Sequence, residues 1–222
     1  MNSYASVLFD LDGTLTNPED GVIKSLLFAL ERMGLPALKG DDLKWCIGPP
    51  FKDVLAKILG SDEPAMIDRA LRLYRDRYRA IGMYENRPYP GIERVLSGLK
   101  KLGMKLYVAT AKPHVFANPI LEHFKLMEYF EGVYGAELDG TRTIKGALIA
   151  HVLKLESISP ASAIMIGDRE FDVIGARENG MPCIGVTYGH GSEAELTAAG
   201  ALYLCRTPQD ILEWFRKNGT SE

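Results

Sequence analysis

Short apolar runs alternate with amphipathic patterns of helical period, most regularly after residue 90, and this alternation restricts the possible folds most strongly. Strand-like runs lie at 7–10, 106–110, 163–167, 183–186 and 201–204. Helical patterns lie at 92–102, 145–155, 171–179, 193–199 and 208–217. Strands joined through helices run parallel and need helices on both faces. We therefore predict an α/β protein with a doubly wound parallel sheet.

The long interval between the first and second strands has a different character. It carries three apolar stripes of helical spacing, within 22–30, 51–59 and 67–81, and shows little strand pattern. The segment 87–91 holds two prolines and a glycine, which suit a stiff connection. We predict a core of residues 1–15 and 84–222 with an inserted helical cap of residues 16–83, and we expect the cap to act as a lid.

Composition excludes several classes of protein. The net charge of -3 over 222 residues gives no basic footprint for nucleic acid. The three cysteines are odd in number and form no Cys-x-x-Cys pair, which argues against a zinc site or a disulfide framework and favours a reduced compartment. No apolar stretch reaches the roughly 18 residues of a membrane span. We therefore expect a cytoplasmic protein without a membrane or nucleic-acid partner.

Two carboxylates follow the first strand-like run. Asp10 and Asp12 come directly after the apolar run 7–9, and Gly13 and Thr14 mark a turn. Open α/β sheets bind ligands at this carboxyl edge of their strands. If the backbone stays extended at Leu11, both carboxylates point to one side, where one could attack an electrophile while the other moves protons. The plainer interpretation is an acidic turn.

Polar groups that suit a phosphate and a metal follow the later strands. Thr110 and Ala111 end the second run with a hydroxyl and backbone N–H groups, and Lys145 begins a helix, where a cation suggests a local negative partner. Asp168 ends the run 163–167, and Asp172 lies one helical turn beyond it. Such hard oxygen ligands favour Mg²⁺. Each residue alone has an ordinary structural explanation, but their order after successive strands favours a phosphoryl-transfer site.

These segments resemble the four motifs of the haloacid dehalogenase-like hydrolase superfamily over essentially the full chain. The resemblance implies a Rossmann-like core with a helical cap inserted after the first motif. It also implies that Asp10 forms an aspartyl-phosphate, that Asp12 acts as general acid and then base, and that Asp172 supports the site. The implied phosphate-binding residues are Thr110, Ala111 and Lys145. The implied Mg²⁺ ligands are Asp10, the backbone carbonyl of Asp12, and Asp168.

The acid at position 12 narrows the resemblance further. Members acting on carbon–halogen bonds lack it and ion-pumping members carry threonine there, so a phosphatase or a phosphomutase is implied. Within the helical-cap group, the chain resembles phosphoglycolate phosphatases and bacterial 5'-nucleotidase-like enzymes, with similar loops at 46–52 and 187–192. The implied substrate is a small phosphate ester, a nucleoside 5'-monophosphate or 2-phosphoglycolate. Lys24 and Lys52 could reach its distal part, or could be solvated helix positions.

Some features depart from the family pattern, and some alternatives stay open. Ala111 stands where serine is more usual, and Pro119 is expected to kink or split a helix over 113–124. Among the histidines, His190 is the one we consider near the site. A sugar-phosphate mutase would share every core motif, and a non-catalytic sensor of phosphometabolites could use the same fold. The sequence does not distinguish among oligomeric states.

Overall fold

The computed structural model describes residues 4–36 and 38–218, and the chain divides into two compact units. The first unit comprises Met1–Asn17 and Pro88–Glu222, and the second comprises Pro18–Arg87. These boundaries lie within a few residues of the expected cap boundaries. The division into a core and a cap that act as separate domains stays a prediction.

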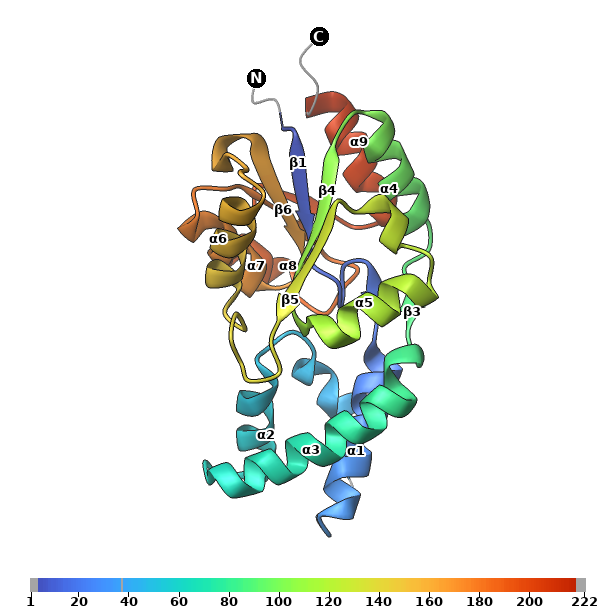
Figure 1. Ribbon diagram of the computed structural model, residues 1–222, viewed down its shortest axis with the longest axis vertical. Helices are drawn as coiled ribbons and strands as arrows, with labels where there is room; N and C mark the ends of the chain where they lie inside the picture. Colours follow the sequence, from blue (N-terminus) through green and yellow to red (C-terminus); the bar gives the residue numbers. More distant parts are fainter. Residues whose placement is uncertain (1–3, 37, 219–222) are drawn as a thin grey trace. The chain divides into compact units, whose positions relative to one another are not determined.

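A six-stranded sheet forms the centre of the first unit, with the strand order β5-β4-β1-β6-β7-β8 (Figure 1). Every neighbouring pair runs parallel. The strands are β1 (Ser6–Phe9), β4 (Lys105–Pro113), β5 (Gly132–Ala136), β6 (Ala163–Gly167), β7 (Cys183–Val186) and β8 (Tyr203–Cys205). The residues of β1 and β6 are buried throughout, as expected for central strands covered on both faces.

Helices cover both faces of this sheet, with α4 and α9 on one side and α6 and α7 on the other (Figure 1). The helices of the first unit are α4 (Ile92–Lys101), α5 (His114–His123), α6 (Lys145–Leu155), α7 (Glu170–Glu178), α8 (Glu193–Ala199) and α9 (Pro208–Asn218). Two short 3-10 helices, η3 (Met127–Tyr129) and η4 (Pro160–Ser162), lie in connections. The predicted α/β class with a doubly wound parallel sheet is confirmed.

Strand β5 was not expected from the sequence. Its five residues, Gly-Val-Tyr-Gly-Ala, contain two glycines and no sustained apolar run. Tertiary pairing forms the strand instead, because β5 lies at the edge of the sheet against β4, where Val133 pairs with Val108. At Gly135 a Cβ atom would lie 2.5 Å from the carbonyl oxygen of Lys112, so the second glycine allows β5 to approach the end of β4.

The helix that was expected to be kinked or split at Pro119 is not split. Residues His114–His123 form one helix, α5, with Pro119 inside it. Proline within a helix removes the hydrogen bond that its own N–H would donate, and its ring crowds the carbonyl four residues earlier. Four buried side chains of α5 stabilise it against the sheet: Phe116, Ala117, Ile120 and Leu121. Burial of this face outweighs the loss of one backbone hydrogen bond.

The second unit is helical, as expected. Its helices are α1 (Glu19–Arg32), η1 (Gly40–Cys46), α2 (Phe51–Leu59), α3 (Pro64–Ala80) and η2 (Gly82–Tyr84). Aromatic rings join α2 to α3, with the ring centroids of Phe51 and Tyr74 4.0 Å apart. The Arg77 guanidinium donates to Glu85 at 2.8 Å and so ties α3 to the end of the unit. Two further strands, β2 (Thr16–Asn17) and β3 (Arg87–Pro88), form a separate two-stranded sheet.

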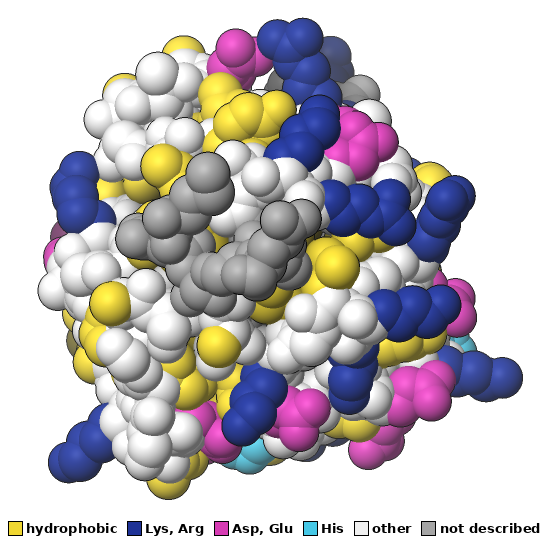
Figure 2. All heavy atoms as spheres, turned by 90° about the horizontal axis from the view of Figure 1, so that it is seen from above, with side chains coloured by type: hydrophobic (Ala, Val, Ile, Leu, Met, Phe, Trp, Pro, Cys, Tyr) yellow, Lys and Arg dark blue, Asp and Glu magenta, His cyan; other side chains and the backbone are white. Residues whose placement is uncertain are grey.

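Two surface properties bear on possible partners. On the face shown in Figure 2, basic side chains are dispersed and acidic ones lie among them. Among the described helices, none combines the length and the apolar character needed to cross a membrane.

Candidate active site

The register of three central strands brings the predicted motifs to one edge of the sheet. Phe9, the last residue of β1, pairs with Val108 of β4 and with Ile166 of β6, so β1 and β6 end at nearly the same level while β4 continues to Pro113. The N–H of Asp10 donates to the carbonyl of Ile166 at 2.9 Å. Asp10 therefore lies between the chain segments that carry Thr110 and Asp168.

Lys145 joins two of the predicted carboxylates. Its ammonium nitrogen lies 3.0 Å from Oδ1 of Asp10 and 2.7 Å from Oδ1 of Asp172, and it donates to the carbonyl of Ala109 at 3.0 Å. Burial alone would lower the lysine pKa, but the two carboxylates outweigh it and the net shift of the pKa is upward. Lys145 is thus held as a buried cation, which explains why a lysine is tolerated at a helix N-terminus.

Asp168 is fully buried and has no ion pair with a lysine or arginine of the described chain. The hydroxyl of Thr14 lies 3.4 Å from its Oδ1, and the backbone N–H of His190 donates to its Oδ2 at 2.8 Å. Burial raises the pKa of Asp168 well above its ordinary value, and the neighbouring Asp172 and Asp10 raise it further. A cation at this point would stabilise the ionised carboxylate.

The carboxylates suit a divalent metal ion. Asp10, Asp168 and Asp172 are buried, and one oxygen of each lies within 4.8 Å of the others. Oδ1 of Asp10 and Oδ1 of Asp172 are paired with Lys145 by charge, but neither accepts a hydrogen bond with good geometry from the described residues. Clustered hard oxygen atoms without a competing histidine or cysteine fit Mg²⁺.

The metal-ligand set expected from the sequence was Asp10, Asp12 and Asp168, with Asp172 in support. In the structure the carboxylate of Asp172 lies with the other two, whereas the carboxylate of Asp12 is engaged elsewhere. This agrees with the implied use of the Asp12 carbonyl rather than its side chain. The assignment of individual ligands stays a prediction.

Asp12 is paired with Lys112, a residue that the sequence analysis did not assign to the site. The lysine nitrogen lies 2.6 Å from Oδ2 of Asp12, and the lysine side chain is 6% exposed. Burial raises the pKa of Asp12 even though Lys112 opposes the shift. A signal for Lys112 was present, because it lies two positions after Thr110 in an extended segment and such residues share one face.

Thr110 and Ala111 lie next to these groups at the end of β4. Thr110 is buried, and its Oγ1 accepts a hydrogen bond from the N–H of Lys112 at 3.2 Å. An acceptor contact of this kind leaves the hydroxyl proton of Thr110 to donate to another group. Ala111 is half-buried and offers only its backbone.

The loop that contains His190 packs directly against Asp168. A Cβ atom at Gly189 would lie 2.4 Å from Cβ of Asp168, so a side chain there would displace this carboxylate. The Tyr188 hydroxyl donates to the carbonyl of Thr14 at 3.0 Å. His190 therefore reaches the site through its backbone N–H.

We expect Gly13→Ala to lower activity about 100-fold, because the added Cβ would displace the carboxylate of Asp168. A shift of roughly 1 Å in a group of the active site has an effect of this size. Gly13 has φ +84°, and a Cβ atom there would lie 2.1 Å from Oδ2 of Asp168. Gly103→Ala is the matched control, because Gly103 has φ +80° but no atom within 4 Å of its added Cβ. Both variants should lose about 1–2 kcal/mol of stability from backbone strain. Equal phosphate release by the two variants would contradict the assignment of Asp168 to the site.

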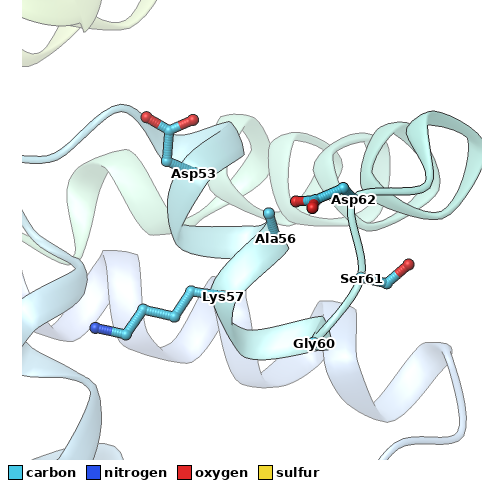
Figure 3. Close-up of a pocket in the computed structure, with 6 residues that line it drawn as sticks. All are labelled: Asp53, Ala56, Lys57, Gly60, Ser61 and Asp62. Carbon is cyan, nitrogen blue, oxygen red and sulfur yellow. The ribbon is translucent and has the colours of Figure 1, made fainter.

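The predicted substrate lysines lie in the second unit. Lys24 is half-exposed and lies 3.6 Å from Glu85, and Lys52 lies 3.3 Å from Asp68. A shallow pocket of this unit lies around the C-terminal half of α2 (Figure 3). Its lining residues, Asp53, Ala56, Lys57, Gly60, Ser61 and Asp62, include neither predicted lysine. The role of Lys24 and Lys52 stays a prediction.

Comparisons with known proteins identify the family of the chain. The sequence pattern of the family described as haloacid dehalogenase-like hydrolase matches residues 7–186. A 5'-nucleotidase of Pseudomonas aeruginosa is 46% identical over 91% of both chains. A tyrosine-protein kinase of Mycobacterium tuberculosis, PtkA, is 38% identical over 83% of this chain and 62% of its own length.

Further relatives carry the name phosphatase. A phosphoglycolate phosphatase of Caulobacter vibrioides is 31% identical over 90% of this chain and 86% of its own. A crystal structure of a predicted phosphatase from Clostridium acetobutylicum is 43% identical, with a TM-score of 0.93 over 97% of this chain and 99% of that chain. The chain therefore belongs to the haloacid dehalogenase-like hydrolases and is a phosphatase of that family.

Proposed function

We propose that this protein is a Mg²⁺-dependent phosphatase that hydrolyses a small phosphate monoester through an aspartyl-phosphate on Asp10. The observation that carries the proposal is the position of Asp10, with Oδ1 3.0 Å from the ammonium of Lys145 and within the buried carboxylate cluster. A carboxylate can approach a phosphate dianion only where nearby cations offset the repulsion. Mg²⁺ held by Asp10, the backbone carbonyl of Asp12 and Asp168, with Asp172 beside them, would supply the rest of that positive charge.

In the first step an oxygen of Asp10 forms a bond to phosphorus as the bond to the ester oxygen breaks. Asp12 gives its proton to the departing oxygen, and Lys145 with the Thr110 hydroxyl and the Ala111 backbone N–H holds the phosphoryl oxygens. In the second step a water oxygen attacks phosphorus, the bond to Asp10 breaks, and Asp12 takes the water proton. Inorganic phosphate and the two aspartates in their starting forms result.

The names of the relatives support nucleoside 5'-monophosphates and 2-phosphoglycolate as the first substrates to test. The groups assigned to the core site bind phosphate and metal. Residues outside it must therefore recognise the part of the substrate that is not phosphate. We propose Lys24 and Lys52 for that role because both have side chains that are about half-exposed.

A cytoplasmic location also stays a prediction, in keeping with three free, buried cysteines.

Phosphate release from a panel of nucleotides, phosphoglycolate and sugar phosphates, with and without Mg²⁺, tests this proposal. One preferred monoester with metal dependence would support it, and Lys24→Ala or Lys52→Ala should then raise KM for that ester with little change in kcat. Interconversion of isomeric sugar phosphates without net release would select a mutase instead. Binding without turnover of any compound would select a sensor.

We expect Mg²⁺ to stabilise the protein against unfolding, by about 2.7 kcal/mol at roughly 100 times its dissociation constant. The reason is that the buried carboxylates of Asp10, Asp168 and Asp172 repel one another. Thermal unfolding at increasing Mg²⁺ measures the effect. Asp168→Asn should remove most of it, whereas Asp139→Asn, at an exposed carboxylate of the same unit, should retain it. A Mg²⁺ effect of equal size in both variants would place the metal elsewhere.

A further inference from the structure

Lys112 is a second buried lysine beside the reacting groups, and neither the family motifs nor the proposed reaction gives it a role. Its nitrogen lies 2.6 Å from Oδ2 of Asp12, and its side chain is almost as buried as that of Lys145. An ion pair this short and this shielded from water holds its partner far more firmly than an exposed pair does. Asp12 therefore has a defined orientation.

The two oxygens of Asp12 have different surroundings. Oδ2 faces the ammonium of Lys112. Oδ1 is buried and accepts no hydrogen bond from any described residue. A buried acceptor without a hydrogen-bond donor costs free energy. At a reaction site, such an oxygen indicates that the substrate supplies the missing hydrogen-bond partner.

The backbone of Lys112 is fixed on two sides. Its N–H donates to Oγ1 of Thr110 at 3.2 Å. Its carbonyl oxygen packs against Gly135 of β5, where a Cβ atom would lie at 2.5 Å. Lys112 also precedes Pro113, whose ring limits the backbone of the preceding residue. The ammonium is thus placed by the sheet and is not carried on a mobile segment.

We propose that Lys112 is a positioning residue that holds Oδ2 of Asp12, so that Oδ1 is the oxygen that gives and takes the proton at the reacting phosphate. This inference rests on the proposed function of Asp12 as general acid and base. The proton of Oδ1 passes to the ester oxygen as the phosphorus–oxygen bond breaks, and Oδ1 later receives a proton from the attacking water. Lys112 keeps its own three protons throughout.

The first test compares two leaving groups in the Lys112→Met variant. With enzyme in excess, we measure leaving-group release in a single turnover from the preferred alkyl phosphate and from p-nitrophenyl phosphate. The alkyl ester needs a proton on its departing oxygen and should lose about 100-fold, a typical value for general acid catalysis. The nitrophenolate departs without a proton, so its release should fall by less than about three-fold. Equal losses for the two esters would overturn the proposal.

A double-mutant cycle with Asp12→Asn separates this role from direct contact with the substrate. If Lys112 acts through Asp12, Lys112→Met should cause no more than about a three-fold further loss in the Asp12→Asn background. If Lys112 binds the phosphate itself, the two losses multiply and KM rises, which would overturn the proposal. Lys100→Met is the control, because Lys100 pairs only loosely with Glu131, at 3.5 Å and exposed, and it should leave both rates unchanged.

Separate measurements distinguish a folding defect of the variants from a loss of function. Thermal unfolding shows whether Lys112→Met folds, and if it does not, Lys112→Arg keeps the charge and should show the same dependence on the leaving group to a smaller degree. Equal losses for the two esters in Lys112→Arg, or wild-type rates with both, would then overturn the inference. The proposed function fails in a different way, because the wild-type protein would then release no phosphate with Mg²⁺.

Discussion

Replacing Asp10 with asparagine should lower phosphate release by about four orders of magnitude or more, the usual result of removing a nucleophile. An amide cannot form the acyl phosphate, and it does not carry the negative charge that pairs with Lys145. The fold should persist, because Asp172 remains 2.7 Å from Lys145 and continues to neutralise it. Phosphate release at saturating Mg²⁺ and thermal unfolding are the two measurements.

Asp76→Asn is the matched control for this variant. Asp76 is an exposed residue of α3, so the same chemical change there should alter neither rate nor stability. Retention of more than about one hundredth of wild-type activity by Asp10→Asn would contradict nucleophilic attack by Asp10.

Lys145→Met should remove both activity and much of the stability of the unit that contains it. Without this cation, the buried carboxylates of Asp10 and Asp172 have no charge partner at 2.7–3.0 Å. Breaking a buried pair from one side costs about 3–5 kcal/mol of unfolding free energy. Activity should fall at least 100-fold, because an electrostatic contact to the transferring phosphoryl group is also lost. Urea unfolding and phosphate release measure the two effects.

Two controls accompany the lysine variant. Lys154→Met changes an exposed residue near the end of the same helix and should behave as wild type. Lys145→Arg keeps the charge, so it should recover much of the stability but little activity, since a guanidinium cannot take the place of a compact ammonium. Equal stability of Lys145→Met and Lys154→Met would show that Lys145 does not neutralise the cluster.

The sequence predicted the central part of the fold because those elements carry strong local signals. The apolar runs that became β1, β6 and β7 are continuous, and Cys183–Val186 was predicted with its observed bounds. Strand β5 was missed because pairing with β4, rather than its own composition, determines it. The helix α5 is not split at Pro119 because its buried face packs against the sheet, a tertiary contact that the sequence pattern does not show.

The sequence predicted those site residues whose place in the fold follows from the order of the strands. Asp10 and Asp168 follow β1 and β6, and Thr110 lies in β4 just past the level at which β1 ends, so the order of strands was enough to bring them together. The pairing of Lys112 with Asp12 was not predicted, because it depends on how two side chains are directed, that of Lys112 near the end of β4 and that of Asp12 in the turn after β1. The same applies to the backbone of His190, which reaches Asp168 through a loop contact.

The most direct test of the account is to trap the phosphoryl group on the protein. Asp12→Asn should slow hydrolysis of the intermediate, so the variant can be mixed with Mg²⁺ and p-nitrophenyl phosphate, whose leaving group needs no proton from Asp12, then quenched and reduced with borohydride. Reduction of an acyl phosphate converts the aspartate into homoserine, which peptide mass spectrometry locates. The account predicts homoserine at position 10 and none in the Asp10→Asn protein. Continued phosphate release with no modification at position 10, or with modification at another residue, would contradict it.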